Sequence, residues 1–424
     1  MKFSPSLYIL SNGAAAILDP MEHLETASMA VAFQTGGRDE SADNAGITHF
    51  MEHMLMKGTP SRPSPRHVRD FAENSGGTIN ASTGNSTIRI YGRVIAENLS
   101  ALAGLVADCV ENPLMDEAAI ENEKRVILDE IRRSGDDPNV RFFYFTAKNI
   151  FAGSGYANET LGTEDAVKSF SRRQLLDWKA RRLSARNCVI AISGKIGDQD
   201  AVVENLEKLF GALPGHAVPA NSANEYTPSF AHNPRPDKNV RIRLAFEDKT
   251  PFGLEYRFKN MCSARFGAAL SDRLHDVVRN GRGLAYRVSG DWFGNEAAGA
   301  DVITTGTAPE HAAETVALIA RTAADMMRRE PFGAAELERW NKRNLLGDAD
   351  WLESQNSRRN KLIDFYFDYG KLYDYYEVNG ISDGITAADV VENTRDAFDG
   401  ALSVITQGAD CRDDLRQVWA DNFK

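Results

Sequence analysis

The chain has 424 residues, which is too many for a single hydrophobic core, so at least two domains are expected. Its composition, with 42% hydrophobic and 26% charged residues, is that of a soluble globular protein. The formal net charge of −11 disfavours nucleic acid as the main partner, because a phosphate-binding surface needs an excess of Lys and Arg. The same charge is compatible with an acidic cavity that receives basic peptides.

The four cysteines, Cys109, Cys188, Cys262 and Cys411, are widely spaced and form no CxxC pair. We therefore expect buried free thiols rather than a disulfide framework or a cysteine zinc site. No run of about 18 apolar residues predicts a transmembrane helix. The N-terminal residues lack the patterns of a signal or transit peptide. The sequence thus favours a cytoplasmic protein, with a periplasmic location as the alternative if a leader has been removed.

In the first half of the chain, turn and capping residues predict strands interrupted by helices. The clearest helix, 65–74, has Ser64 as N-cap, Pro65 at its first position and Gly76 at its C-terminal end. The other predicted elements are a hairpin over 7–18, strands over 29–35 and 87–94, and helices over 97–111 and 116–134. This order fits an α+β sandwich, with helices on one face of a mostly antiparallel sheet.

A cluster of prolines divides the chain into two parts. Five of the fifteen prolines fall between Pro214 and Pro236, within 23 residues. Because proline interrupts both helices and central strands, we predict a linker over 216–237. It would join an N-terminal domain over 1–215 to a C-terminal domain over 238–424.

The two parts look like a diverged repeat. The apolar strand pattern over 188–194 recurs over 402–408, which is 214 positions later. A long helical pattern at 119–122 has a counterpart at 336–339, 217 positions later. This nearly constant offset predicts two homologous α/β-sandwich domains.

The run His49-x-x-Glu52-His53 is the strongest motif in the chain. On a helix, at about 100° per residue, His53 lies about 40° and Glu52 about −60° from His49, opposite an apolar stripe. One face can pack into the domain while the other offers two imidazoles to a metal ion, with a carboxylate as general base. The alternative is two unrelated surface histidines, but only eight histidines occur in the chain, so the spacing favours a metal site.

A zinc peptidase site uses three protein ligands and a water, so a third ligand is needed from another element. In the predicted helix 116–134, Glu123 and Glu130 lie about 20° apart within the apolar stripe, whereas Glu121 and Asp129 point to solvent. A carboxylate on a core-facing stripe is costly unless it is paired or binds a metal. The pair therefore belongs either to the metal site or to a buried salt bridge with an arginine.

The segments 37–40 and 45–59, which include the histidine motif, resemble the signature of peptidase family M16, the inverzincins. The resemblance places Glu130, 77 residues after His53, as the third Zn²⁺ ligand beside His49 and His53. Glu52 would take the proton of the attacking water and deliver it to the leaving amine. In the family, a glutamate seven residues before the third ligand is hydrogen-bonded near the site, and Glu123 matches it.

The resemblance extends into the second half of the chain. Segment 279–286 is similar to the family's segment that holds substrate and stabilises the tetrahedral intermediate, so those roles fall on Arg279 and Tyr286. From spacing alone, a helix end at Gly281 or Gly283 with a packed tyrosine is the favoured explanation of the segment. In contrast, the positions that correspond to the zinc motif, 263–267, contain no histidine.

Substrate contacts are expected on a strand in the first half. Segment 78–82 resembles the family's strand that pairs with the substrate backbone, which assigns Asn80, Ala81 and Ser82 to substrate binding. The alternative is a plain hairpin strand. We also place Phe50 among the substrate-binding residues.

The sequence thus predicts a zinc-dependent endopeptidase that cleaves peptides or unfolded segments. Family clamshells contain four such domains around a closed chamber, and this chain supplies two. The resemblance therefore implies a homodimer, in which Arg279 and Tyr286 of one chain complete the zinc site of the other; a heterodimer with an M16 paralogue is the alternative. The alternative function is a non-catalytic or partner-dependent structural or assembly subunit on the same fold.

Overall fold

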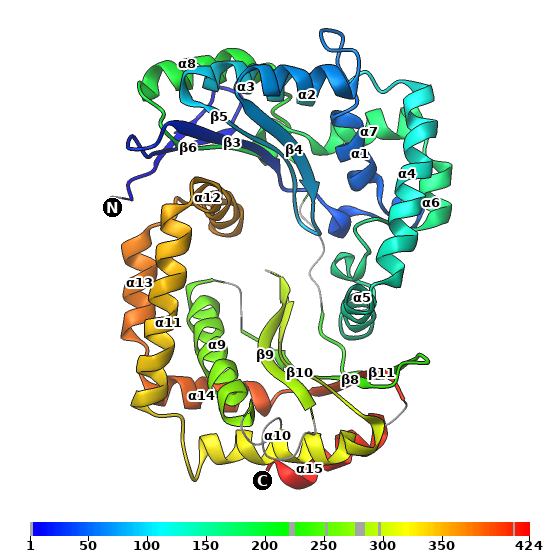
Figure 1. Cartoon of the computed structure of the whole chain (residues 1–424), viewed down its shortest axis with the longest axis vertical. Helices are drawn as coiled ribbons and strands as arrows, with labels where there is room; N and C mark the ends of the chain where they lie inside the picture. The colour runs from blue at the N-terminus through cyan, green and yellow to red at the C-terminus, as the bar shows by residue number, and fades with distance from the viewer. Residues whose placement is uncertain (1–2, 220–224, 251–252, 276–284, 296–297, 410–411) are drawn as a thin grey trace. The chain divides into compact units, whose positions relative to one another are not determined.

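The computed structural model describes residues 3–219, 225–250, 253–275, 285–295, 298–409 and 412–424. Two mixed sheets with helices packed against them confirm the predicted α+β class (Figure 1). Among the helices in these ranges, none combines the length and the apolar run that a membrane crossing requires.

The chain forms two compact units that do not follow its two halves. Unit 1 contains residues 1–141, 158–222 and 348–375, whereas unit 2 contains residues 142–157, 223–347 and 376–424. Each unit therefore includes a segment from the other half of the chain. The predicted linker over 216–237, between two homologous copies of a repeat, therefore stays a prediction.

Unit 1 is built on a six-stranded sheet in the order β1-β2-β6-β3-β5-β4. Its strands are β1 (Ser6–Ile9), β2 (Ala15–Pro20), β3 (Thr26–Phe33), β4 (Gly77–Thr83), β5 (Ile88–Ile95) and β6 (Cys188–Gly194). Its helices are α1 (Ile47–Leu55), α2 (Pro65–Asn74), α3 (Leu99–Glu111), α4 (Glu117–Asp136), α6 (Glu164–Ser169), α7 (Arg172–Arg182), α8 (Gln199–Phe210) and α12 (Gln355–Tyr369). The β2–β6 pair is parallel and the other pairs are antiparallel.

Local signals placed several of these elements correctly. The helix α2 has the predicted bounds, and the Ser64 side chain accepts a hydrogen bond from the backbone N–H of His67. Gly76 follows the helix with a φ of +68°, a left-handed conformation that favours glycine. The strand β6 also has the predicted bounds.

Helices cover both faces of the central strands in unit 1, not one face as predicted. The helices α3 and α8 pack on one face, and α12 packs against β3 and β6 on the other (Figure 1). All residues of β6 are buried, and so are seven of the eight residues of β3. Strands buried on both faces lack the polar alternation of a half-exposed strand, which the sequences of β3 and β6 reflect.

Unit 2 has a five-stranded sheet in the order β7-β11-β8-β10-β9. Its strands are β7 (Phe230–Pro234), β8 (Val240–Asp248), β9 (Ala285–Asn295), β10 (Ala298–Thr307) and β11 (Leu402–Gly408). Its helices are α9 (Leu254–Leu274), α10 (Ala312–Met327), α13 (Tyr375–Gly384), α14 (Ala387–Phe398) and α15 (Arg412–Asn422), with most of α5 (Pro138–Ile150) and of α11 (Ala334–Glu353).

The two sheets share one topology. In unit 1, β6 lies between the parallel strand β2 and the antiparallel strand β3, followed by β5 and β4. In unit 2, β11 lies in the same way between β7 and β8, followed by β10 and β9. The strands β4 and β9 therefore occupy equivalent edges. The chain between β3 and β4 includes α1, which carries the two histidines, whereas α9, between β8 and β9, carries no histidine in the corresponding positions.

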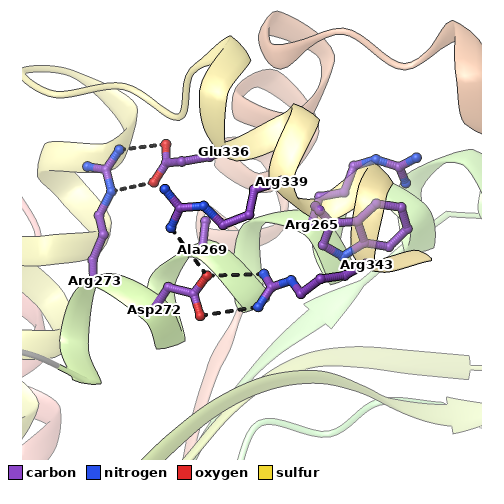
Figure 2. A pocket seen from close by; sticks show the side chains of 8 residues that line it. Arg265, Ala269, Asp272, Arg273, Glu336, Arg339 and Arg343 are labelled. Atoms are coloured by element: carbon purple, nitrogen blue, oxygen red, sulfur yellow. Dashed lines mark hydrogen bonds and ion pairs between the residues drawn. The ribbon is translucent and has the colours of Figure 1, made fainter. Parts of the chain in front are cut away.

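A pocket of unit 2 lies between α9 and α11 and contains an ion-pair network (Figure 2). Arg273 forms a two-pronged pair with Glu336, with Nε–Oε1 and Nη2–Oε2 distances of 2.7 and 2.8 Å. Asp272 pairs with Arg343, with an Nη2–Oδ2 distance of 3.1 Å. Both carboxylates of the pocket therefore form ion pairs between α9 and α11, so we assign the pocket a structural role.

Candidate metal centre

The helix that carries the histidines starts at a glycine that no other residue can replace without strain. Gly46, the N-cap of α1, has a φ of +90°, and a Cβ there would stand 2.5 Å from the carbonyl oxygen of Leu161. The buried carboxylate of Glu40 accepts the backbone N–H groups of Gly46 and Thr48, at 2.6 and 2.8 Å. It thereby satisfies donors at the N-terminus of α1. Burial nevertheless raises the pKa of Glu40 to about 7.

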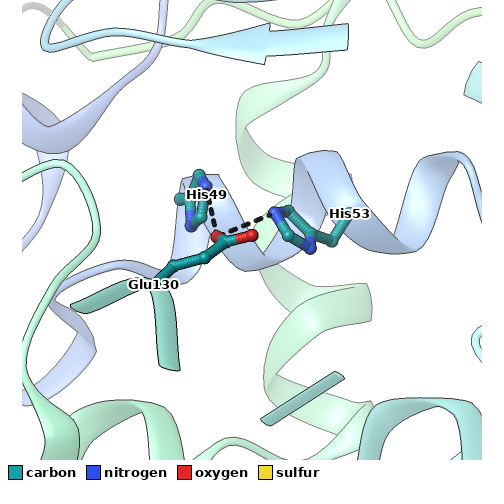
Figure 3. Close-up of side chains that lie close together, drawn as sticks. All are labelled: His49, His53 and Glu130. Atoms are coloured by element: carbon teal, nitrogen blue, oxygen red, sulfur yellow. Dashed lines mark ion pairs between the residues drawn. The ribbon is translucent and has the colours of Figure 1, made fainter. Parts of the chain in front are cut away.

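Three side chains from α1 and α4 converge on one point (Figure 3). The Nε2 atoms of His49 and His53 lie 3.7 and 3.5 Å from Oε2 of Glu130. These distances are too long for good hydrogen bonds. Two ligand atoms that share a tetrahedral Zn²⁺ stand about 3.4 Å apart, given Zn–N and Zn–O bonds of about 2.0–2.2 Å. Two imidazoles and one carboxylate are also a donor set that zinc prefers, so the residues fit this metal.

The protonation of His49 suits a ligand. Burial, and then the nearby His53, lower the pKa of His49 to about 3. The imidazole of His49 is therefore neutral at physiological pH, which is the form that binds a metal.

The helix α4 presents its carboxylates as the periodicity predicted. Glu123 is 3% exposed and lies on the buried face with Ile127, whereas Glu121 and Asp129 are exposed. Glu130 is half-buried on the same side, where it faces the histidines. Val126, about 60° from Glu123 around the helix axis, is 42% exposed because it lies at the margin of the buried face.

Glu123 supports the second histidine. Its Oε1 atom lies 2.7 Å from Nδ1 of His53, and its Oε2 atom lies 2.6 Å from Nζ of Lys57. Burial alone would raise the pKa of Glu123, but these contacts with His53 and Lys57 outweigh it and lower the pKa. A carboxylate on Nδ1 leaves Nε2 of His53 free for a metal, an arrangement common around zinc.

Glu52 lies between the histidine helix and the edge strand. Its side chain comes from α1, and its Oε2 atom accepts a hydrogen bond of 2.7 Å from the hydroxyl of Thr83, the last residue of β4. Burial raises the pKa of Glu52. A carboxylate with a raised pKa, one oxygen of which is held by a donor, is suited to take and return a proton.

Two sequence models of one family match the chain. The model described as Insulinase (Peptidase family M16) matches residues 17–164, and the model described as Peptidase M16 inactive domain matches residues 169–343. The chain belongs to peptidase family M16. The first match contains the three converging side chains, and the second contains the Arg279 and Tyr286 segment.

Relatives of this M16 protein carry zinc protease names. An uncharacterized zinc protease of Rickettsia bellii is 26% identical over 408 residues, which cover 95% of this chain and 97% of the relative. The mitochondrial-processing peptidase subunit beta of Dictyostelium discoideum is 30% identical over 210 residues, which cover 49% of this chain and 45% of that protein.

Solved structures share the fold at low sequence identity. A protease from Helicobacter pylori aligns with a TM-score of 0.84 and 17% identity, over 96% of this chain and 100% of that one. A chain of Complex III2 from Candida albicans aligns with a TM-score of 0.82 and 16% identity, over 97% of this chain and 99% of that one. The same fold is therefore found in a protease and in a chain of Complex III2.

The predicted substrate residues fall in different places. Asn80 and Ser82 are exposed on β4, and Ala81 between them faces the core. The prediction for Phe50 is corrected: its side chain is fully buried and packs edge-on against Phe170, with ring centroids 5.7 Å apart. Its position on the apolar stripe of α1 explains why it faces the core.

The predicted oxyanion pair is only partly within the described structure. Arg279 lies outside the described residues. Tyr286 lies in β9, the edge strand of the second sheet, and its side chain is outside the described part. Their roles in this M16 chain stay predictions.

Sequence reasoning missed three residues around the site, Lys57, Thr83 and Glu40. Lys57 follows His53 by four residues. In a helical pattern, this spacing indicates that the two side chains lie on the same face. Thr83 and Glu40 had no such signal, because their partners on α1 come close only after β4 and the loop before α1 have folded.

Proposed function

We propose that this M16 protein is a zinc-dependent endopeptidase that cleaves peptides or unfolded segments. The observation that carries the proposal is the convergence of Nε2 of His49, Nε2 of His53 and Oε2 of Glu130 at distances that suit a shared ion. A general base belongs beside such a site, and Glu52, which directly precedes His53 on α1, is our candidate. The zinc protease names of relatives over nearly the whole chain are consistent with this proposal.

The reaction is assigned to residues of this chain. Bound Zn²⁺ would polarise the scissile carbonyl and acidify a water molecule. Glu52 takes the proton of the attacking water and returns it to the nitrogen of the leaving amine, while Thr83 holds one of its oxygens. Glu123 keeps His53 oriented. The exposed edge of β4 would hold the substrate as an added strand, through backbone hydrogen bonds that tolerate many sequences.

A closed chamber formed by two chains completes the proposal. Arg279 and Tyr286 of one chain would stabilise the developing oxyanion at the zinc site of the other, as the family resemblance implies. A homodimer is the simplest arrangement, because this chain carries both sets of residues; a heterodimer with an M16 paralogue is the alternative. A cytoplasmic location, or a periplasmic one, also stays a prediction.

The test combines metal analysis with peptide cleavage. The purified wild-type protein should contain zinc and cleave a quenched peptide pool. Glu52→Gln should retain zinc and lose cleavage by about 10²-fold or more, because general acid–base catalysis contributes about 10²–10⁴-fold. Glu121→Gln, on the exposed face of α4, is the matched control and should change neither. Cleavage by Glu52→Gln at the wild-type rate would refute the assignment of the base.

A second function uses the same fold without catalysis. The likeness to a chain of Complex III2 favours a structural or assembly subunit. Such a subunit would cleave no peptide, whether or not it binds zinc. A partner-dependent peptidase would instead cleave peptides once an M16 partner is bound. Mass spectrometry of the native complex identifies such a partner, and a cleavage assay of that complex then distinguishes the partner-dependent peptidase from the non-catalytic subunit.

A further inference from the structure

Lys57 is joined to the proposed metal site through one intermediate side chain. It lies two residues beyond the end of α1, and its Nζ atom contacts Oε2 of Glu123 at 2.6 Å. The other oxygen of Glu123 contacts Nδ1 of His53 at 2.7 Å. Both oxygens of one buried carboxylate are therefore engaged, one by the cation and one by the imidazole.

We propose that Lys57 is a positioning residue: through Glu123 it sets the ring orientation and tautomer of His53, so that Nε2 points at the metal. This inference rests on the proposed zinc site and adds a residue to it. Lys57 itself contacts none of His49, His53 or Glu130 in the structure's ion pairs and hydrogen bonds.

The physical argument concerns rotation of the carboxylate. A carboxylate held at one oxygen can turn about its terminal side-chain bond, because that torsion is broad. Engagement of the second oxygen by Lys57 fixes the plane of Glu123. The Glu123 side chain is 5% exposed and the Lys57 side chain 28% exposed, so the ammonium reaches from the surface to a buried charge. Because a buried charge without a partner is strongly unfavourable, the Glu123 carboxylate holds the Lys57 ammonium against its second oxygen.

A purely structural tie between α1 and α4 is the competing explanation. A matched pair separates the two, because Lys124 lies next to Glu123 on α4 and pairs with Glu121 at 2.7 Å. Glu121 is exposed and contacts no histidine in the described structure. Loss of either lysine removes one ion pair from α4, but only the loss of Lys57 should disturb His53.

The first experiment measures zinc affinity by competition with a chromophoric chelator, using zinc-free protein that is reloaded. Lys57→Met should weaken zinc binding by about 10–100-fold, the range seen when groups behind a metal ligand are changed. Lys57→Arg should recover most of the affinity, and Lys124→Met should retain it. Zinc affinity of Lys57→Met within about twofold of the wild type would overturn the proposal, even if its thermal midpoint falls.

The second experiment needs no zinc and so distinguishes failure of this inference from failure of the proposed function. Selective ¹⁵N labelling of histidine reports the tautomer of His53 in zinc-free protein. The wild type and Lys124→Met should show the proton on Nδ1, and Lys57→Met should show a mixture of tautomers. An unchanged Nδ1–H signature in Lys57→Met would refute the inference. If Lys57→Met does not fold, Lys57→Gln takes its place in both measurements.

Discussion

At the residue scale, the proposed site includes side chains that hydrogen-bond to its histidine and its glutamate and hold them in position. Glu123 holds the ring of His53, and Thr83 holds one oxygen of Glu52. Each contact engages one atom of its partner, Nδ1 in the histidine and Oε2 in the glutamate. We expect such residues to affect different steps, because Glu123 contacts a proposed metal ligand and Thr83 contacts the proposed base.

Thr83 should affect the chemical step without affecting the metal. Thr83→Val removes the hydroxyl that donates to Glu52 and should lower kcat about tenfold, since a hydrogen bond to a charged group contributes about 1.5–3 kcal/mol. Zinc content should not change, and Thr83→Ser should restore most of the rate. Steady-state kinetics with a quenched peptide make the measurement. A wild-type kcat for Thr83→Val would show that the hydrogen bond does not matter.

Burial of the Asp301 carboxyl should make the unfolding free energy of unit 2 depend on pH. Burial raises its pKa to about 7, with Asp248 adding to the rise and Ser263 and Lys259 opposing it. The folded carboxyl is thus neutral at pH values where the unfolded one, with an ordinary pKa of 3.8, is ionised. Its contribution to stability is complete below that value and is lost as the pH rises through about 7.

The variant Asp301→Asn tests this dependence, because an amide cannot ionise. It should match the wild type near pH 4 and exceed it above pH 7, by up to about 4 kcal/mol in unfolding free energy. Denaturant unfolding at both pH values gives the comparison. Asp399→Asn, at an exposed acid near the same strands, should show no such divergence. Parallel pH profiles for Asp301→Asn and the wild type would contradict the burial argument.

At the element scale, α12 shows how the second half of the chain stabilises the first sheet. Its Arg358 guanidinium pairs with the fully buried Asp19 of β2, with an Nε–Oδ2 distance of 2.7 Å. Arg359 donates to Ser28 of β3, and the side-chain amide of Gln355 hydrogen-bonds to Thr26 of the same strand. A helix that begins 161 positions after the end of β6 (355 − 194) thereby completes the second face of the sheet.

Loss of Arg358 should strongly destabilise unit 1. Arg358→Met leaves the Asp19 carboxyl buried without its cation and should cost about 3–5 kcal/mol of unfolding free energy. Asp364→Asn, on the same helix, breaks the half-exposed pair with Arg89 and should cost at most about 1 kcal/mol. Denaturant titration of the three proteins makes the comparison. Equal losses in both variants would show that burial of the Arg358 pair is unimportant.

At the scale of the whole molecule, the two sheets of one topology carry different chemistry. The histidine helix α1 precedes the edge strand β4 in unit 1, and Tyr286 lies in the equivalent edge strand β9 of unit 2. One chain therefore contains a copy with the two histidines and a copy without them. This asymmetry is the basis for proposing that two chains combine their copies into complete sites.

Mixing two inactive variants tests the shared site. Glu52→Gln and Tyr286→Phe should each have little activity as homodimers, whereas mixed dimers should contain up to one intact site and regain cleavage. Cleavage is measured after subunit exchange, with native mass spectrometry to confirm the mixed species. Confirmed mixed dimers that stay inactive would rule out completion of the site by a second chain.

Local sequence patterns supported the prediction of the fold class and the candidate metal donors of this protein. The spacing of His49 and His53 and the capping of α2 act over a few residues, so periodicity and turn chemistry reveal them. Periodicity also selected Glu123 and Glu130 from the carboxylates of α4, because a helix repeats its faces regularly. Together with the family resemblance, these patterns predicted the fold class and the donor set.

Only the tertiary structure decided which distant groups meet. The approach of Thr83 to Glu52, of Lys57 to Glu123 and of α12 to the first sheet depends on how separate elements pack. A sequence pattern indicates which side of a helix or strand is buried, but the partner on the other element is set by packing over the whole unit. That is why the sequence predicted the donors of the proposed metal site, while the side chains that support them and the helix on the second face of the sheet became evident only in the folded chain.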